Sequence, residues 1–130
     1  MNIITIRTDK PESEIGIYQQ ATPLAYYTWN ANRELAETIH KVIEEQLTQQ
    51  NLEYKDINAI VFYKGPGSFT GLRIGASVAN ALASSLNVSI VGETGDDWIS
   101  DGIIRLNDGE NDKIVVPEYG SEPNITKPKK

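Results

Sequence analysis

Lys-Gly-Pro-Gly-Ser-Phe-Thr-Gly-Leu-Arg-Ile-Gly, residues 64–75, joins an apolar run to a segment rich in small residues. The apolar run, residues 57–63, has the composition of a buried strand. Pro66 fixes its own φ and the glycines beside it can adopt positive φ, so the chain can reverse sharply at this point. Ser68 or Thr70 then suits the N-cap of a helix. The stretch therefore predicts a strand, a tight turn and a helix in succession.

Length and composition limit the possible functions. The 130 residues predict one domain, and the sequence has no cysteine and a single histidine. We therefore expect no disulfide, no thiol chemistry and no metal site. The net charge of −6 argues against a surface that binds nucleic acid directly, so any contact with tRNA should be indirect. No apolar run approaches the roughly 20 residues of a membrane span, and residues 1–7 are too short for a signal peptide. We expect a soluble, cytoplasmic protein.

The residues before the turn predict three strands and a helix. Residues 2–8, 15–18 and 24–29 are β-branched or aromatic runs separated by turn-forming residues, which indicates a meander of three strands. From residue 32 to residue 50 the apolar positions recur at steps of three and four, which predicts a first long helix.

A second helix, over residues 69–86, carries small residues at every fourth position. Gly71, Gly75, Ala79 and Ala83 would leave a shallow groove along one face. Glycine inside a helix costs about 1 kcal/mol relative to alanine, so close packing should repay the loss. The packing partner could be the sheet or first helix of this chain, or another molecule, and the sequence leaves both open. The intermolecular alternative predicts that leucine at position 75 or 79 leaves the protein folded but abolishes association. The predicted partner interface comprises Leu35, Ile39, Val42, Ile43, Gly71, Leu72, Gly75, Ala76, Ala79 and Ala83.

After the second helix, residues 88–92 read as another buried strand. The order strand, strand, strand, helix, strand, helix, strand predicts an α/β lobe over residues 1–92. Residues 93–119 then predict a short helix and a small hairpin, formed by residues 103–106 and 113–116. Residues 120–130 are poor in apolar side chains and predict an extended or mobile tail.

The chain resembles the TsaB (YeaZ) family. Residues 65–75 match that family's signature Gly-Pro-Gly-Ser-Phe-Thr-Gly-Leu-Arg-Ile-Gly without a gap. Residues 116–119 and 122–129 are similar, more weakly, to the closing Pro-x-Tyr segment of family members. The resemblance implies a single lobe of the actin-like ATPase, ribonuclease H-like fold.

It also implies a function. Members of the family are non-catalytic subunits of the machinery that makes threonylcarbamoyladenosine in tRNAs that read ANN codons. Their catalytic partner is TsaD, and the ATPase TsaE joins the assembly. The pairing helices of the family correspond here to residues 32–50 and 69–86. The resemblance thus implies binding to TsaD, a homodimer through the same helices in isolation, and no cofactor, with ATP or ADP possible only at a subunit junction.

The chain departs from the family pattern at two places. Where members have Ile-Asp-Thr-Ser at the end of the first strand, this chain has Ile6-Arg7-Thr8-Asp9, so an arginine replaces the carboxylate used by phosphate-transferring relatives. In addition, only residues 93–115 occupy the space of the family's second lobe. We therefore expect a second lobe reduced to about a hairpin, which leaves a nucleotide cleft without its far wall.

Three alternatives compete with a scaffold, and one of them is a self-associating homodimer module that uses the small-residue helix and no longer binds TsaD. The other two are enzymes that use the glycine-rich turn. The turn of Gly65, Gly67 and Ser68 could bind a phosphate through its backbone amides, but it lacks the Walker pattern. Lys64 and Arg73 beside it could contact a nucleotide or a partner, or simply form local ion pairs. A hydrolase would instead use Ser68 as nucleophile and His40 as base, with Asp9 or Asp56 orienting the base. The sequence favours a structural turn that presents the second helix.

Overall fold

The computed structural model describes residues 1–120, so most of the predicted tail and the weaker match at residues 122–129 lie outside the described residues. The fold is a five-stranded sheet with the strand order β3-β2-β1-β4-β5. β1 (Asn2–Arg7), β2 (Glu12–Gln19) and β3 (Thr22–Asn30) form an antiparallel meander. β4 (Ala59–Tyr63) and β5 (Ser89–Glu93) extend the sheet in parallel beside β1.

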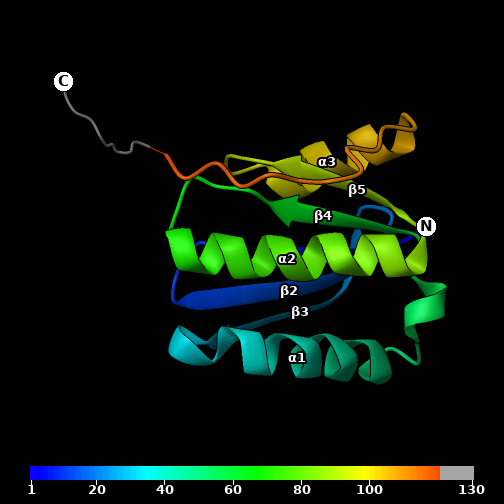
Figure 1. The fold of residues 1–130 in the computed structure, drawn as a ribbon. Helices are drawn as coiled ribbons and strands as arrows, with labels where there is room; N and C mark the ends of the chain where they lie inside the picture. Colours follow the sequence, from blue (N-terminus) through cyan, green and yellow to red (C-terminus); the bar gives the residue numbers. More distant parts are fainter. Residues whose placement is uncertain (121–130) are drawn as a thin grey trace.

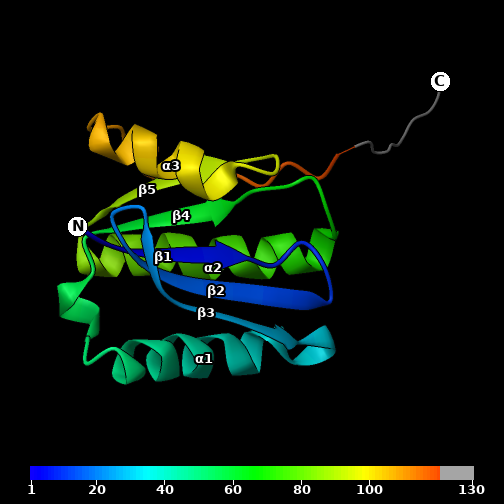
Figure 2. The same cartoon turned by 180° about the vertical axis from the view of Figure 1, so that it is seen from behind.

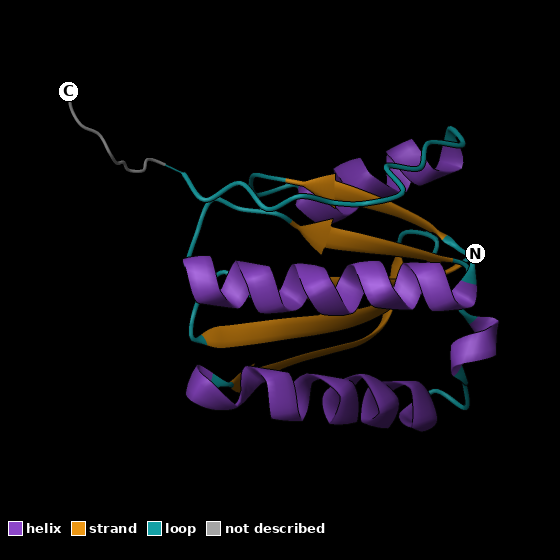
Figure 3. Cartoon of the chain, viewed as in Figure 1, coloured by secondary structure: helices purple, strands orange, loops and turns teal. Residues whose placement is uncertain are grey.

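Helices cover both faces of the sheet. α1 (Leu35–Gln49) and α2 (Phe69–Leu86) lie side by side on one face, as Figure 1 and Figure 3 show. α3 (Trp98–Asn107) lies on the other face, over β4 and β5 (Figure 2). Two short 3₁₀ helices, Asn32–Glu34 and Tyr54–Asp56, come before α1 and β4. The predicted α/β lobe and its order of strands and helices are confirmed. Within residues 1–120, no helix is both long and apolar enough to cross a membrane.

Alternation along the central strands divides the core into two layers. In β1 and β4, Ile4, Ile6 and Phe62 are fully buried in the layer beneath α1 and α2. Their neighbours Ile3 and Val61 are fully buried in the layer beneath α3. Side chains alternate between the two faces along a strand, so a strand that is covered on both faces has a continuous apolar sequence. Such continuous runs predicted β1 and β4.

The predicted hairpin after β5 is wrong. Its first half belongs to α3, in which Trp98, Ile103 and Leu106 are buried while Ile104 is 59% exposed. That spacing is the spacing of a helical face, although the pair of isoleucines resembled a strand. Gly102 lets the helix approach the sheet, because a Cβ there would lie 2.5 Å from Cγ1 of Val61.

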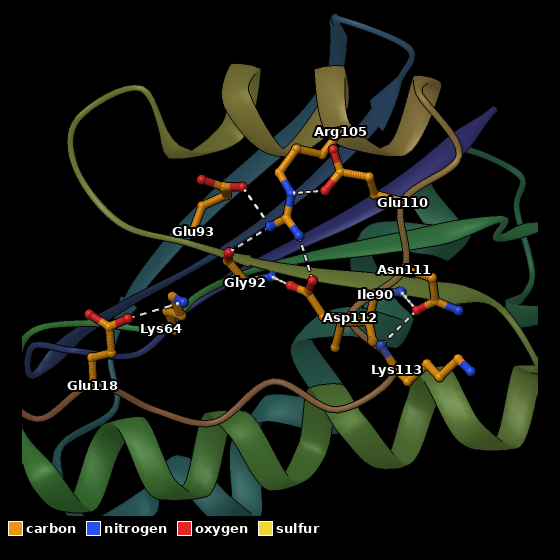
Figure 4. Close-up of polar contacts among 10 residues, drawn as sticks. All are labelled: Lys64, Ile90, Gly92, Glu93, Arg105, Glu110, Asn111, Asp112, Lys113 and Glu118. Carbon is orange, nitrogen blue, oxygen red and sulfur yellow. Dashed lines mark hydrogen bonds and ion pairs between the residues drawn. The ribbon is translucent and has the colours of Figure 1, made fainter.

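The second half of the predicted hairpin is an irregular segment without strand pairing, which turns tightly at Lys113, where φ is +68° and the Ile114 amide donates to the Asp112 carbonyl at 2.7 Å. Residues 111–119, which we call the strap, run beside β5 between α2 and α3 (Figure 1). Arg105 on α3 anchors the start of this segment. Its guanidinium lies 2.9 Å from a carboxylate oxygen of Glu93 and 2.8 Å from one of Glu110, and it also binds Asp112 (Figure 4). One arginine therefore ties together β5, α3 and the strap.

The Asp112 carboxylate makes the attachment of the strap dependent on pH. Burial raises the pKa of Asp112, but the hydrogen bonds from Arg105 and from the Gly92 amide outweigh burial, and the pKa lies below its ordinary value. A lowered pKa stabilises the folded state above the unfolded-state pKa of about 3.9, and the gain is lost as pH falls through the folded-state pKa. We expect hydrogen-exchange protection of the Gly92 amide to decrease below about pH 4. An Asp112→Asn variant should show no such step, and an identical step there would assign it to another group.

Candidate partner-binding site

The β4–α2 turn, residues 64–68, packs against the end of β1. The amide of Ser68 donates to the carbonyl of Asp9 at 2.9 Å. Gly67 permits this approach, because a Cβ there would lie 2.9 Å from the same carbonyl oxygen. Gly65 has a φ of +126° and precedes a cis peptide bond to Pro66. Gly67 is thus required by its contact with Asp9, which lies 58 positions earlier and directly follows the end of β1, and Gly65 by its positive φ and by the nearby backbone of Glu118.

Arg7 and Asp9 neutralise each other at the end of β1. Nε of Arg7 lies 2.8 Å from Oδ1 of Asp9, and a second nitrogen lies 3.2 Å from Oδ2. This hydrogen-bonded pair raises the pKa of the Arg7 guanidinium. The guanidinium also lies 3.9 Å from the ring centroid of Tyr63, and the Asp9 carboxylate is almost completely buried. The carboxylate nearest the turn is therefore occupied by Arg7.

The two cations predicted beside the turn have different environments. Nζ of Lys64 lies 3.1 Å from Oε2 of Glu118 in the strap, which is a local ion pair. Arg73 on α2 is exposed and makes no ion pair within residues 1–120, and its guanidinium lies 5.4 Å from the ring centroid of Phe69. Of the two, Arg73 is the cation that remains available to another molecule.

The structure does not bring the hydrolase residues together. Ser68 is the N-cap of α2, where its hydroxyl accepts from the Gly71 amide at 3.5 Å, and His40 is exposed on α1. Both candidate orienting carboxylates are engaged elsewhere, Asp9 by Arg7 and Asp56 by the amide of Glu53. No hydrogen bond within residues 1–120 joins any two members of the proposed triad.

Replacing Ser68 with alanine should therefore cost stability. Loss of an N-cap costs about 0.5–2 kcal/mol, and the long hydrogen bond here places the expected loss near 0.5–1 kcal/mol. Urea unfolding measures the free energy of unfolding directly. Thr70→Ala is the matched control, because Thr70 is exposed beyond the cap and its loss should change stability by less than about 0.5 kcal/mol. An equal loss in both variants would contradict the assignment of the cap to Ser68.

Most of the predicted interface side chains are buried within this chain. In α1 they face the sheet, and Ile39 and Ile43 are fully buried. In α2 a Cβ at Gly75 would lie 2.9 Å from Phe62, and Gly71 lies directly against the backbone of Thr8. The small-residue stripe thus packs against β1 and β4. Of the two packing partners that the sequence left open, this is the one inside the same chain. The interface residues that belong to the hydrophobic core are Leu35, Ile39, Val42, Ile43, Leu72, Ala76, Ala79 and Ala83.

The outer face of α2 is the surface that the sequence reasoning missed. Among its eighteen residues only Arg73 is charged. Apart from Arg73 and the exposed Phe69 at the first position of the helix, its exposed positions carry small uncharged side chains, and Ile74 and Val78 are half-buried beside them. Charged residues are depleted at the centre of protein interfaces, so this face can approach another protein closely at little cost of desolvation. The near absence of charged residues from α2 can be read from the sequence and is the signal that could have indicated this surface. The exposed small residues of this face are Thr70, Ser77, Ala81, Ser84 and Ser85.

Comparison with known proteins identifies the family. The family model described as "TsaD: tRNA N6-adenosine threonylcarbamoyltransferase" matches residues 29–94, about half of the chain. The tRNA threonylcarbamoyladenosine biosynthesis protein TsaB of Escherichia coli is 32% identical over 92 residues, which cover 71% of this chain and 39% of that protein. The chain belongs to the TsaB (YeaZ) family. It spans less than half the length of this curated relative.

A related enzyme and a solved structure are also similar to this chain. The tRNA N6-adenosine threonylcarbamoyltransferase of Geotalea daltonii is 44% identical over 62 residues, which cover 48% of this chain and 18% of that enzyme. The structure of YeaZ from Pseudomonas aeruginosa superimposes with a TM-score of 0.67 at 22% identity, covering 72% of this chain and 43% of that one. The likeness to YeaZ supports the predicted actin-like, ribonuclease H-like fold.

Proposed function

We propose that the chain is a non-catalytic subunit that binds TsaD and supports threonylcarbamoyladenosine formation in tRNA. Its membership of the TsaB (YeaZ) family carries the proposal, because the TsaB relative is named for this pathway. The match to a TsaD family model and the similarity to a threonylcarbamoyltransferase point to the same pathway. By the family pattern, TsaE joins the resulting assembly, and the chain alone forms a homodimer through the same helices.

The outer face of α2 is the contact surface in this proposal. It lies beside α1, so the two helices together offer a helical layer to a partner (Figure 3). Arg73 lies at the edge of the uncharged surface and is free to pair with a carboxylate of the partner. Small side chains at Ser77 and Ala81 let a second helix approach the backbone closely. The turn presents this helix, as the sequence favoured, but through its outer face.

A nucleotide site in this proposal exists only at the junction with the partner. The carboxylate beside the turn is paired with Arg7, and the nearest lysine, Lys64, is paired with Glu118. Neither group is preorganised for a phosphate or a metal–nucleotide complex. ATP or ADP would therefore need groups supplied by the other subunit.

Reconstitution with and without the chain tests the function. We expect the chain to co-purify with TsaD of the same organism, and tRNA modification by the remaining components to fall when the chain is omitted. The purified chain alone should neither hydrolyse ATP nor cleave a peptide. Modification that proceeds equally well without the chain would contradict the proposal.

A further inference from the structure

The outer edge of β5 is closed by side chains and one amide of the strap. The Ile90 amide donates to Oδ1 of Asn111 at 3.1 Å, and the Ile90 carbonyl accepts from the Asp112 amide at 2.8 Å. The Gly92 amide donates to Oδ2 of Asp112 at 2.9 Å, and its carbonyl accepts from Arg105 at 3.1 Å (Figure 4). An edge strand normally needs such protection, because its unpaired groups can add another strand.

α2 holds the same segment from the opposite side by its backbone. The side-chain amide of Asn80 donates to the Val115 carbonyl at 2.9 Å, and its oxygen accepts from the Val115 amide at 2.9 Å. A primary amide that pairs with both backbone groups of one residue imitates a neighbouring strand. Asn80 therefore binds the backbone of the residue at position 115 and makes no hydrogen bond that depends on the side chain there.

One side chain of the strap provides selectivity. Val115 is 4% exposed, whereas its neighbours Ile114 and Val116 are 68% and 70% exposed. Val115 fits against Gly92, where an added Cβ would lie 2.5 Å from its Cγ1. The alternation of one inward and two outward side chains is that of an extended peptide in a groove.

The far end of the strap is fixed at the β4–α2 turn. The Glu118 amide donates to the Lys64 carbonyl at 2.7 Å, and the two side chains form the ion pair described above. The ring of Tyr119 lies 4.5 Å from that of Phe69 at the start of α2, measured between centroids. Backbone contacts thus occur at both ends and in the middle of the segment.

We propose that the groove formed by Lys64, Asn80, Ile90 and Gly92 is a binding site for an extended peptide. Its occupant here is the strap of the same chain, and the occupant that it takes in exchange is the strap of a second copy. A second copy presents the same complementary set, namely an Asn-Asp pair, an inward valine three residues later and a glutamate three residues after that. This inference is independent of the contact with TsaD.

The strap is built so that it can be exchanged. It follows α3 through the exposed turn of residues 108–110 and has no strand pairing of its own, so it can detach without breaking a ladder between strands. Detachment opens the backbone groups of Ile90 and Gly92 at the edge of β5. Two of its three central side chains, Ile114 and Val116, are mostly exposed and gain little from burial, and segments with few buried apolar contacts open locally at low cost. The strap in place competes with any added peptide. The apparent affinity for the peptide is therefore lower than the intrinsic affinity when only a small fraction of the grooves is open.

A labelled synthetic peptide of residues 110–120, standing for the strap of a second copy, tests the proposal by fluorescence anisotropy. The full chain carrying Val115→Ser and Asp112→Ala should bind the peptide at least 10-fold more tightly than the unaltered chain. These changes weaken the strap in place but leave the groove intact. Adding Asn80→Ala to that variant should weaken binding at least 10-fold. A scrambled peptide of the same composition should not bind. Hydrogen exchange at residues 112–118 reports whether the strap is released.

Each other outcome contradicts the proposal. A strap that stays fully protected in the double variant would show that these contacts do not hold it. A released strap without peptide binding would show that the groove does not accept the segment in trans. Binding that ignores Asn80, or that the scrambled peptide reproduces, would assign the peptide to another surface. Circular dichroism confirms that each variant is folded before it is compared.

Discussion

Replacing Gly75 with leucine is expected to unfold the protein or to destabilise it severely. Gly75 sits where α2 crosses the end of β1, and an added Cβ would lie 2.9 Å from Phe62 and 3.0 Å from Cβ of Thr8. Both neighbours are completely buried, so neither can move into solvent. Overpacking of a filled core costs about 1–3 kcal/mol and sometimes more, and a leucine against two buried side chains belongs at the upper end. The total free energy of unfolding of a domain of this size is about 5–15 kcal/mol.

Urea unfolding of Gly75→Leu and of Ser77→Leu separates packing inside the chain from packing between molecules. Ser77 is exposed on the same helix, so its substitution should shift the free energy of unfolding by less than about 0.5 kcal/mol. We expect a loss of about 3 kcal/mol or more for Gly75→Leu. A Gly75→Leu protein with an unchanged unfolding midpoint would instead restore the sequence prediction that position 75 faces another molecule.

The sequence predicted the lobe because local signals there agree with the tertiary structure. The glycine-rich turn and the N-cap residue at its end are determined largely by local backbone chemistry, and the apolar runs of β1 and β4 reflect burial on both faces. The match of residues 65–75 to a family signature supported the same fold. The turn and the cap depend mainly on neighbours close in the sequence, although Gly67 also fits against Asp9.

The interface and the region after β5 could not be predicted in the same way. The period of α2 identifies an apolar face but not what covers it, and the covering residue at Gly75 is Thr8, 67 positions earlier. The strap depends on the pairing of Asn80 with Val115, 35 positions apart, which leaves no periodic signal. Ile103 and Ile104 were read as a strand because β-branched pairs favour strands, whereas packing of Gly102 against the sheet favours the helix.

Placing charges on the outer face of α2 is expected to abolish binding to TsaD. The pair Ser77→Glu and Ala81→Lys lies at positions i and i+4, where glutamate before lysine slightly stabilises a helix, so the fold should be kept. At the centre of an interface, a charge without a partner costs about 2–5 kcal/mol, which corresponds to about a 30-fold to several-thousand-fold loss of affinity. The matched control is Ser100→Glu with Ile104→Lys, which introduces the same two charged residues at exposed positions i and i+4 of α3.

The dissociation constants of TsaD with these two variants test directly whether the outer face of α2 binds TsaD. We expect the α2 variant to bind at least 30-fold more weakly than the unaltered chain, and the α3 variant to bind within about threefold of it. tRNA modification should follow the same order, and unfolding by urea should show that both variants are as stable as the unaltered chain. Unchanged affinity of the α2 variant, or an equal loss in both, would contradict the assignment of TsaD binding to the outer face of α2.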